Sequence, residues 1–312
     1  KKYKEAVAVA VEACAEDTKG QTCYICTQAL HWKTKEGLVR GCSCRGTSGF
    51  AHVSCLAEQA KILVAEAEEN NLGAKAWNER WARWSMCSLC EQRHQGVVKC
   101  ALGWVCWKTY LGRPETDETR ILAMTQLGNG LFEAGHYDDS LSVMEAELAT
   151  LQRIGAPEEQ ILVTQGNLAG LYGQLGRLEG ALLMQRDTYA GRLKLRGEEH
   201  NQTLFAAYNY ANLLVHLERY AEAKALLRQT IPVARRVLGE SDQLTLKTRW
   251  VYAMALYKDD SASLDHLREA VMMYEDNARI ARRVYGGAHP LVVDIEHGRK
   301  CHKLCFTPSP FE

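Results

Sequence analysis

Seven cysteines and one histidine between residues 23 and 90 fall into four short pairs. The pairs are Cys23-x2-Cys26, Cys42-x-Cys44, His52-x2-Cys55 and Cys87-x2-Cys90. Zn²⁺ takes four thiolate or imidazole ligands at the corners of a tetrahedron, and each close pair supplies two corners. Eight ligands make two closed, structural sites. We therefore expect two structural Zn²⁺ ions here and no open position for catalysis.

The order and spacing of these ligands resemble one family of zinc fingers. The stretch Gly41–Leu56, with its Cys-x-Cys pair and seven residues from Cys44 to His52, is similar to the RING-CH signature. A PHD-type finger shares the ligand order and stays open as an alternative. It is favoured by the 31 residues that separate Cys55 from Cys87 and by the nearby Trp84.

The RING-CH resemblance implies an interleaved pairing of the ligands, in which the first and third pairs share one ion and the second and fourth share the other. The first set is Cys23, Cys26, His52 and Cys55, and the second set is Cys42, Cys44, Cys87 and Cys90. Spacing alone leaves consecutive pairing open. In either arrangement, the free energy of metal binding becomes folding free energy for a segment poor in apolar residues.

The same resemblance implies an E3 ubiquitin-protein ligase, which holds a ubiquitin-loaded conjugating enzyme and needs no catalytic residue of its own. Ile25 and Leu89 would contact the conjugating enzyme, and Arg93 would hydrogen-bond at its junction with ubiquitin. Gln59 departs from the family, which has a tryptophan at this position. A non-catalytic interaction scaffold is therefore an alternative, and a PHD-like reader of histone tails is a third.

Composition favours an intracellular and most simply cytoplasmic protein. The 312 residues carry 38 basic and 38 acidic side chains, so the sequence does not favour a nucleic-acid partner. Seven of the twelve cysteines stand at metal spacing, and the rest show no disulfide framework. The sequence shows no signal peptide and no apolar run long enough for a membrane span, although it begins at Lys1 without methionine.

A repeat of about 42 residues organises the rest of the chain. The segment 126–141 aligns with 167–182 at an offset of 41, and 167–182 aligns with 209–224 at an offset of 42. Such a period is typical of an α-solenoid, with two amphipathic helices per repeat. Small residues recur where helices approach closely, and Gly135 and Gly176 suit helix C-caps. The small residues are Gly128, Ala169, Ala211 and Ala253.

The motif Asn167–Tyr172 and the later stretches Gly197–His200 and Gly286–Pro290 resemble the tetratricopeptide repeats of kinesin light chains. The resemblance implies a groove that binds a peptide or protein substrate along the first helix of each pair. Side-chain amides both donate and accept hydrogen bonds, so recurring asparagines are candidates for holding a peptide backbone. They are Asn129, Asn167, Asn209 and Asn212.

These signals predict a mostly α protein in which a small two-zinc, cross-brace finger precedes an α-solenoid of tetratricopeptide-type helix pairs. Trp77, Trp81 and Trp84 recur at helical spacing and predict a core stripe that packs the finger against the helices. The expected segments are a helical start (1–19), the finger with a helical insert (20–95), a linker (96–117), the solenoid (118–297) and a tail (298–312).

Overall fold

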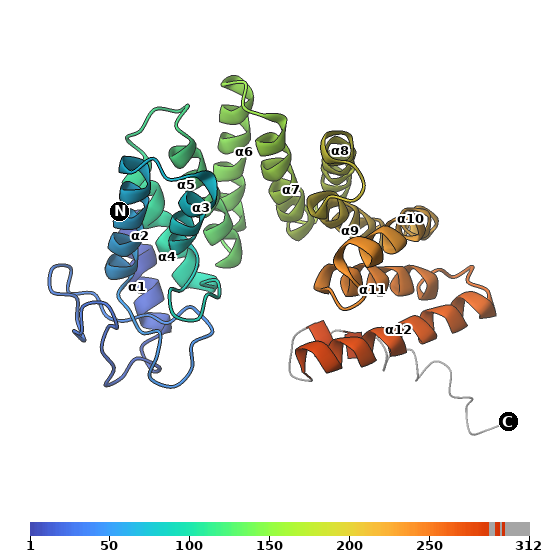
Figure 1. Ribbon diagram of the computed structural model, residues 1–312, viewed down its shortest axis with the longest axis horizontal. Helices are drawn as coiled ribbons and strands as arrows, with labels where there is room; N and C mark the ends of the chain where they lie inside the picture. Colours follow the sequence, from blue (N-terminus) through green and yellow to red (C-terminus); the bar gives the residue numbers. More distant parts are fainter. Residues whose placement is uncertain (287–290, 294, 297–312) are drawn as a thin grey trace. The chain divides into compact units, whose positions relative to one another are not determined.

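The computed structural model describes residues 1–286, 291–293 and 295–296 (Figure 1). The expected tail, 298–312, and the expected end of the solenoid at 297 lie outside the described residues. The chain forms two compact units, Lys1–Leu171 and Tyr172–Glu312. Secondary structure in the described residues is helical apart from two isolated β-bridges, Val39 with Ala51 and Met86 with Arg93. None of the helices there is long and apolar enough to cross a bilayer.

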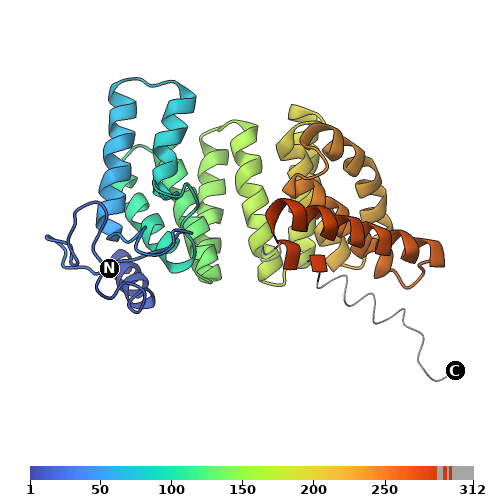
Figure 2. The same ribbon diagram turned by 60° about the horizontal axis from the view of Figure 1, so that its bottom comes forward.

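The first unit begins with helix α1 (Lys2–Ala13), followed by finger loops that reach α2 (Val53–Glu69). A helical hairpin then separates the third and fourth ligand pairs (Figure 2). It consists of α2, α3 (Ala74–Trp81) and a short 3-10 turn (Ala82–Trp84). After the last ligand pair come α4 (Gly96–Tyr110), α5 (Glu118–Glu133), α6 (Tyr137–Arg153) and α7 (Glu158–Gln174).

Helix α4 occupies the stretch that the sequence assigns to a linker, and it is the centre of the first unit. Its sequence is apolar around most of its circumference, which is typical of a helix covered on all sides. One side joins a core with α1 and the finger loops through Val98 and Leu102. Another side joins the hairpin through Cys106 and Tyr110. Finger and first repeat are therefore parts of one folded body.

The tryptophans of the hairpin lie in this core, as the sequence predicts. Trp84 and Trp81 are buried, and Trp77 stacks on Trp81 with ring centroids 5.5 Å apart. The Tyr110 ring lies 5.6 Å from Trp81 and 5.8 Å from Trp84. Because aromatic rings bury large apolar areas, this cluster fixes the hairpin to α4.

An ion pair between Arg113 and Glu68 links the end of α2 to the segment that follows α4. The Arg113 guanidinium donates two hydrogen bonds of 2.8 Å to the Glu68 carboxylate at the end of α2. Thr119, at the start of α5, donates a third at 3.2 Å. These contacts lower the pKa of Glu68, chiefly through the hydrogen bonds from Arg113. A bidentate pair of this kind fixes geometry as well as adding attraction.

Two glycines let α4 and α5 approach closely. A Cβ added at Gly103 would lie 2.8 Å from the carbonyl oxygen of Gln126, and one at Gly130 would lie 2.9 Å from the Cα of Cys100. Backbone cannot move away as a flexible side chain can. The pattern of repeats did not single out either glycine, because the contact joins the first repeat to a helix outside the repeats.

The helix pairs continue in the second unit with α8 (Leu178–Arg196), α9 (Asn201–His216), α10 (Tyr220–Leu238), α11 (Gln243–Tyr257) and α12 (Leu264–Tyr285). The predicted small residues are buried at their repeat positions, Ala211 and Ala253 completely so. Gly135 and Gly176 follow the first helices of their pairs with positive φ, as predicted, and Glu218 takes the same conformation in the third repeat.

We expect Gly103→Ala to destabilise the protein by about 1–3 kcal/mol, because the new methyl group meets backbone that must shift. Gly170→Ala is the matched control, since a Cβ at this helical position meets nothing within 4 Å. Because alanine has a higher helix propensity than glycine, Gly170→Ala should leave the stability unchanged or raise it by up to about 1 kcal/mol. Denaturant unfolding of both variants measures the difference, and equal stabilities would contradict the close packing of α4 on α5.

A buried carboxyl group on α6, that of Glu147, makes the stability of the fold depend on pH. Glu147 is 3% exposed and accepts hydrogen bonds from Thr125 at 2.7 Å and Thr164 at 2.9 Å. Burial raises its pKa to about 7, and the two hydroxyls only partly offset this. The folded state therefore binds this proton more tightly than the unfolded chain does. The contribution to stability is complete below the unfolded pKa and is lost as pH rises through 7.

We expect Glu147→Gln to remove this loss and to stabilise the protein at pH 8 by about 1–3 kcal/mol relative to wild type, while the difference shrinks toward pH 5. Unfolding free energies measured across this range give the slope. Glu12→Gln, a change at an exposed position on α1, should leave the pH profile of wild type intact. An identical profile for Glu147→Gln and wild type would show that the carboxyl is ionised in the fold.

Candidate metal centre

The eight ligand-type residues gather into two clusters of four. One cluster holds Cys23, Cys26, His52 and Cys55, and the other holds Cys42, Cys44, Cys87 and Cys90. Within each cluster the potential ligand atoms all lie within 4.8 Å of one another. The grouping is interleaved, so each cluster joins loops that are distant along the chain. All ten cysteines in the described residues are free thiols.

The separations suit tetrahedral zinc. Zn–S bonds of about 2.3 Å place two sulfurs about 3.8 Å apart, and a Zn–N bond of about 2.1 Å places nitrogen and sulfur about 3.6 Å apart. The Sγ atoms of Cys44 and Cys87 are 3.8 Å apart. Nδ1 of His52 lies 3.4 Å from Sγ of Cys26 and 3.5 Å from Sγ of Cys55. The donor set and its geometry thus fit Zn²⁺.

The first and last ligand pairs stand on loops with the same backbone pattern. In Cys23–Gln28, the Cys23 amide donates to the Gln28 carbonyl, and the amide of Ile25 donates to Sγ of Cys23. In Cys87–Gln92, the Cys87 amide donates to the Gln92 carbonyl, and the amide of Leu89 donates to Sγ of Cys87. In both loops a backbone amide thus faces the first sulfur of the pair and holds it in place.

The two loops are neighbours in space. The Tyr24 hydroxyl lies 3.0 Å from the Ser88 hydroxyl, within hydrogen-bonding distance. Ile25 and Leu89 occupy equivalent positions of the two loops and are 36% and 52% exposed. Arg93, just after the second loop, is also exposed and bridges to Met86. Ile25, Leu89 and Arg93 are candidate contacts from the sequence. The Tyr24–Ser88 link was not predicted, although the match between the two Cys-x2-Cys-x-Gln stretches could have suggested it.

Helix α2 positions the histidine. His52 is the N-cap residue of α2 and Cys55 lies in its first turn. Nε2 of His52 is 3.4 Å from the carbonyl oxygen of Ala29, while Nδ1 faces the thiols. A proton on Nε2 donated to Ala29 leaves the Nδ1 lone pair for a metal, an arrangement typical of ligating histidines. Burial of the ring lowers its pKa, which favours the neutral form that can ligate.

The second cluster depends on a glycine. Gly49 has a φ of +84°, and a Cβ there would lie 2.5 Å from the Cys44 Cβ and 3.2 Å from the Cys42 Sγ. Arg40 braces the same loop by donating to the Gly46 carbonyl at 2.9 Å and by covering the Phe50 ring at 4.4 Å. The role of Gly49 was not predicted from the sequence, although a glycine five residues after a cysteine pair can signal a tight turn.

Thiol pKa values show why these clusters need a cation. Burial raises the pKa of Cys42 to about 11, and burial together with neighbouring sulfurs raises those of Cys44 and Cys55 well above the usual range. Burial also acts to raise the pKa of Cys90, but hydrogen bonds from the Gln92 backbone and nearby thiols outweigh it and bring the value to about 7. Crowded thiolates repel one another, and a divalent cation among them removes that penalty.

The asparagines that the sequence marks for peptide binding lie on first helices of the pairs and are all half-buried. Asn129 and Asn167 belong to the first unit, and Asn209 and Asn212 to the second. In the second unit the main-chain carbonyl oxygen of Asn212 lies 2.8 Å from Nδ1 of His216, one turn later in the helix. This contact does not involve the Asn212 side chain. Their side-chain roles toward a peptide stay predictions.

The site and the fold together define a zinc-finger protein with helical repeats. Comparison with known families is more specific. Residues 23–71 match the RING-variant domain, and residues 161–202 and 202–276 match tetratricopeptide repeats. The chain thus carries a RING-variant finger joined to tetratricopeptide repeats. The match to the finger ends before Cys87 and Cys90, which the hairpin of α2 and α3 separates from the other ligands.

Solved structures give a further set of similarities. The chain is 18% identical to a kinesin light chain protein of Podosopora anserina with nearly identical TPR-like repeats, over 75% of this chain and 98% of that chain, with a TM-score of 0.49. It is 12% identical to BtubC (BKLC) of P. vanneervenii, over 83% and 95% of the two chains, with a TM-score of 0.48. No curated protein sequence matches the chain.

Proposed function

We propose that this chain is a ubiquitin-protein ligase whose finger binds two structural Zn²⁺ ions and docks a ubiquitin-conjugating enzyme, while the helical repeats bind the substrate. The first ion is held by the Cys23 cluster and the second by the Cys42 cluster. Since zinc thiolates need a reducing compartment, we place the protein inside the cell. The RING-variant match supports this family of fingers over the PHD-type alternative.

The observation that carries the proposal is the exposed apolar pair on two neighbouring metal-binding loops. Ile25 and Leu89 face solvent at equivalent positions, and the link between Tyr24 and Ser88 holds their loops together. An apolar pair held on rigid loops is suited to docking a protein. In this proposal the finger forms no covalent bond with ubiquitin, and its role is to orient the thioester of the conjugating enzyme toward a substrate lysine.

One feature favours a non-catalytic scaffold as the second candidate. Gln59 is half-buried on α2, where the family has a tryptophan that packs on the conjugating enzyme. A glutamine there removes a large apolar contact from the docking surface. In the scaffold hypothesis, the finger serves to complete the core that α4 shares with the first repeat.

We expect zinc analysis of the purified protein to give two ions per chain and Gly49→Ala to lower the value toward one, because the new Cβ displaces the thiols of the Cys42 cluster. Gly46→Ala is the control, since Gly46 also has positive φ but a Cβ there meets nothing within 4 Å. Equal loss of zinc in both variants would point to loop strain instead. A value of one in wild type would contradict the two-ion assignment.

The ligase proposal is tested by discharge of a ubiquitin-loaded conjugating enzyme onto free lysine, across a panel of such enzymes. We expect Ile25→Ala and Leu89→Ala each to slow discharge by about tenfold, a typical loss for a central interface side chain. Leu111→Ala, a similar truncation at an exposed position, should keep the wild-type rate. Gln59→Trp should increase it.

The same experiment separates the two candidates. Discharge by wild type that depends on Ile25 and Leu89 supports the ligase. If neither wild type nor Gln59→Trp promotes discharge with any conjugating enzyme, although both contain their full zinc, the ligase proposal is overturned and the scaffold hypothesis is left.

A further inference from the structure

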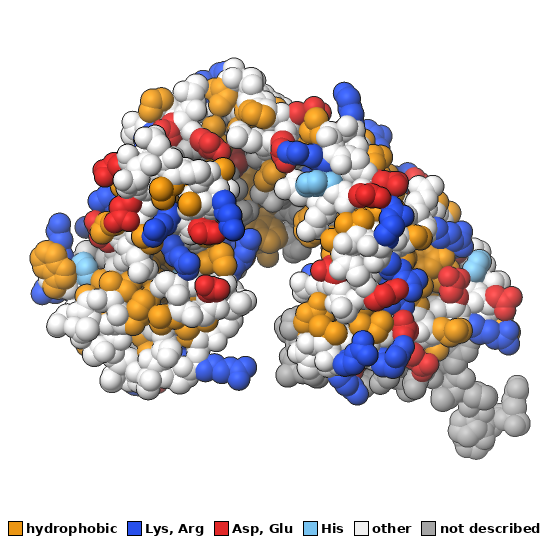
Figure 3. All heavy atoms as spheres, in the orientation of Figure 1, with side chains coloured by type: hydrophobic (Ala, Val, Ile, Leu, Met, Phe, Trp, Pro, Cys, Tyr) orange, Lys and Arg blue, Asp and Glu red, His pale blue; other side chains and the backbone are white. Residues whose placement is uncertain are grey.

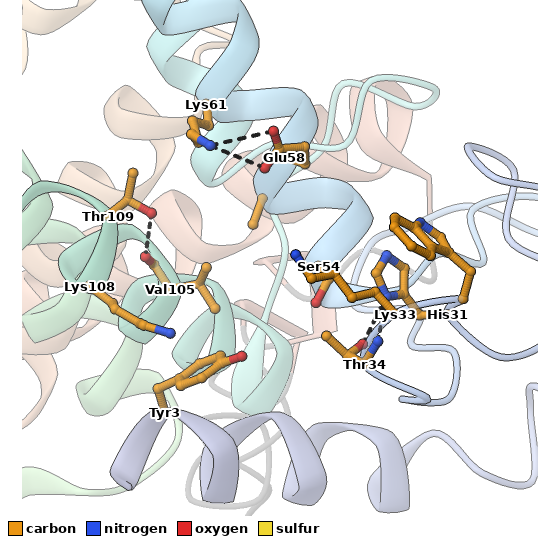
Figure 4. Close-up of a pocket in the computed structure, with 12 residues that line it drawn as sticks. Tyr3, His31, Lys33, Thr34, Ser54, Glu58, Lys61, Val105, Lys108 and Thr109 are labelled. Carbon is orange, nitrogen blue, oxygen red and sulfur yellow. Dashed lines mark hydrogen bonds and ion pairs between the residues drawn. The ribbon is translucent and has the colours of Figure 1, made fainter.

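A cleft of about 830 Å³ lies between α1, the loop at 31–34, α2 and α4 of the first unit (Figure 4). In Figure 4, Lys33 and Lys108 extend toward the cleft from opposite sides, and the Tyr3 ring lies between them on α1. Its volume exceeds what one amino-acid side chain fills, so the cleft has room for a short stretch of peptide.

The charges around the cleft are unbalanced. Three ammonium groups line it, those of Lys33, Lys61 and Lys108, against the single carboxylate of Glu58. Glu58 lies 3.4 Å from Lys61 on the same helix. Within the described part of the chain, Lys33 and Lys108 have no carboxylate partner, and Lys108 rests over the Tyr3 ring at 4.2 Å. The cleft therefore has a positive potential that suits a ligand with several negative charges.

An exposed tryptophan forms one wall. Trp32 is 68% exposed although its loop is held on both sides: the His31 amide donates to the Glu36 carbonyl, and the Thr34 amide donates to Nδ1 of His31. Glu36 in turn accepts from the Ser54 amide at 2.7 Å. Figure 3 shows apolar side chains protruding at the edge of the finger beside lysine and histidine. An exposed indole on a loop held in this way offers a partner a large apolar contact.

This cleft is distinct from the surface of Ile25 and Leu89. The residues of α2 that line it, Ser54, Ala57, Glu58 and Lys61, share one side of the helix. Gln59, the position at which the family contacts a conjugating enzyme, is rotated from the centre of that side by about 150° at 3.6 residues per turn. The two faces of α2 therefore can bind different partners at once.

We propose that the cleft binds an acidic peptide segment that carries one large apolar side chain. The carboxylates pair with Lys33 and Lys108, and the apolar side chain packs on the Trp32 indole. A peptide fits better than nucleic acid, because a nucleic-acid track needs an extended row of basic side chains, whereas these lysines surround a single cleft on a chain of zero net charge.

The test is fluorescence anisotropy of the full-length, zinc-loaded protein with a fluorescein-labelled, glutamate-rich peptide that has one central tryptophan. We expect saturable binding that weakens as salt rises to about 0.5 M, where screening is short-ranged. Lys33→Glu/Lys108→Glu should weaken binding by at least about tenfold. Lys4→Glu/Lys75→Glu makes the same change of net charge at exposed lysines outside the cleft and should have little effect.

A second pair of variants tests the apolar contact with Trp32. Trp32→Ala should weaken binding by about threefold or more, whereas Leu30→Ala, at a 58% exposed position outside the cleft lining, should not. Absence of saturation, or equal weakening by the two lysine double variants, would overturn the proposal. So would displacement of the peptide by a single-stranded oligonucleotide of equal charge at lower concentration than unlabelled peptide. No ubiquitin component is present, so failure here is independent of the ligase proposal.

Discussion

Thiolate crowding is the constraint on which the first unit depends. The Cys42 cluster brings four sulfurs within 4.8 Å, and burial already raises the pKa of its members Cys42 and Cys44. Without a cation these groups stay protonated or repel one another. A metal ion held by this cluster would convert the repulsion into an attraction that closes the loop between Cys44 and Cys87.

That closed loop contains the hairpin of α2 and α3, and the hairpin carries the tryptophans of the main aromatic core. Trp81 and Trp84 pack on Tyr110 of α4, and α4 packs in turn on α5 at Gly103 and Gly130. The Cys42 cluster, the hairpin and the first repeat are therefore joined in one series of contacts. A finger built into a repeat body in this way presents its surfaces at fixed positions relative to α5, α6 and the start of α7.

Two surfaces of the finger follow from this arrangement. The two metal-binding loops expose Ile25 and Leu89, and the opposite side of α2 borders a lysine-lined cleft with an exposed indole. Both depend on loops that the clusters hold in place, since His31 at the cleft has its ring 5.3 Å from that of His52 in the first cluster. Our proposals give these surfaces to different partners, a folded conjugating enzyme and an acidic peptide.

The sequence by itself determined the ligand types, the repeat period and the core role of the tryptophans. These are local patterns: short ligand pairs, an offset of 41 or 42 residues, and spacing along one helix. The resemblance to RING-CH fingers implied the interleaved pairing, but the spacing left consecutive pairing open, because the 31 residues between Cys55 and Cys87 allow several closures. The tertiary structure brings together the interleaved sets. It also decided that residues 96–110 form a buried helix, that Gly49, Gly103 and Gly130 are close contacts, and that Lys33 and Lys108 meet at one cleft. Each of these is a relation between distant segments, which periodicity and spacing do not record.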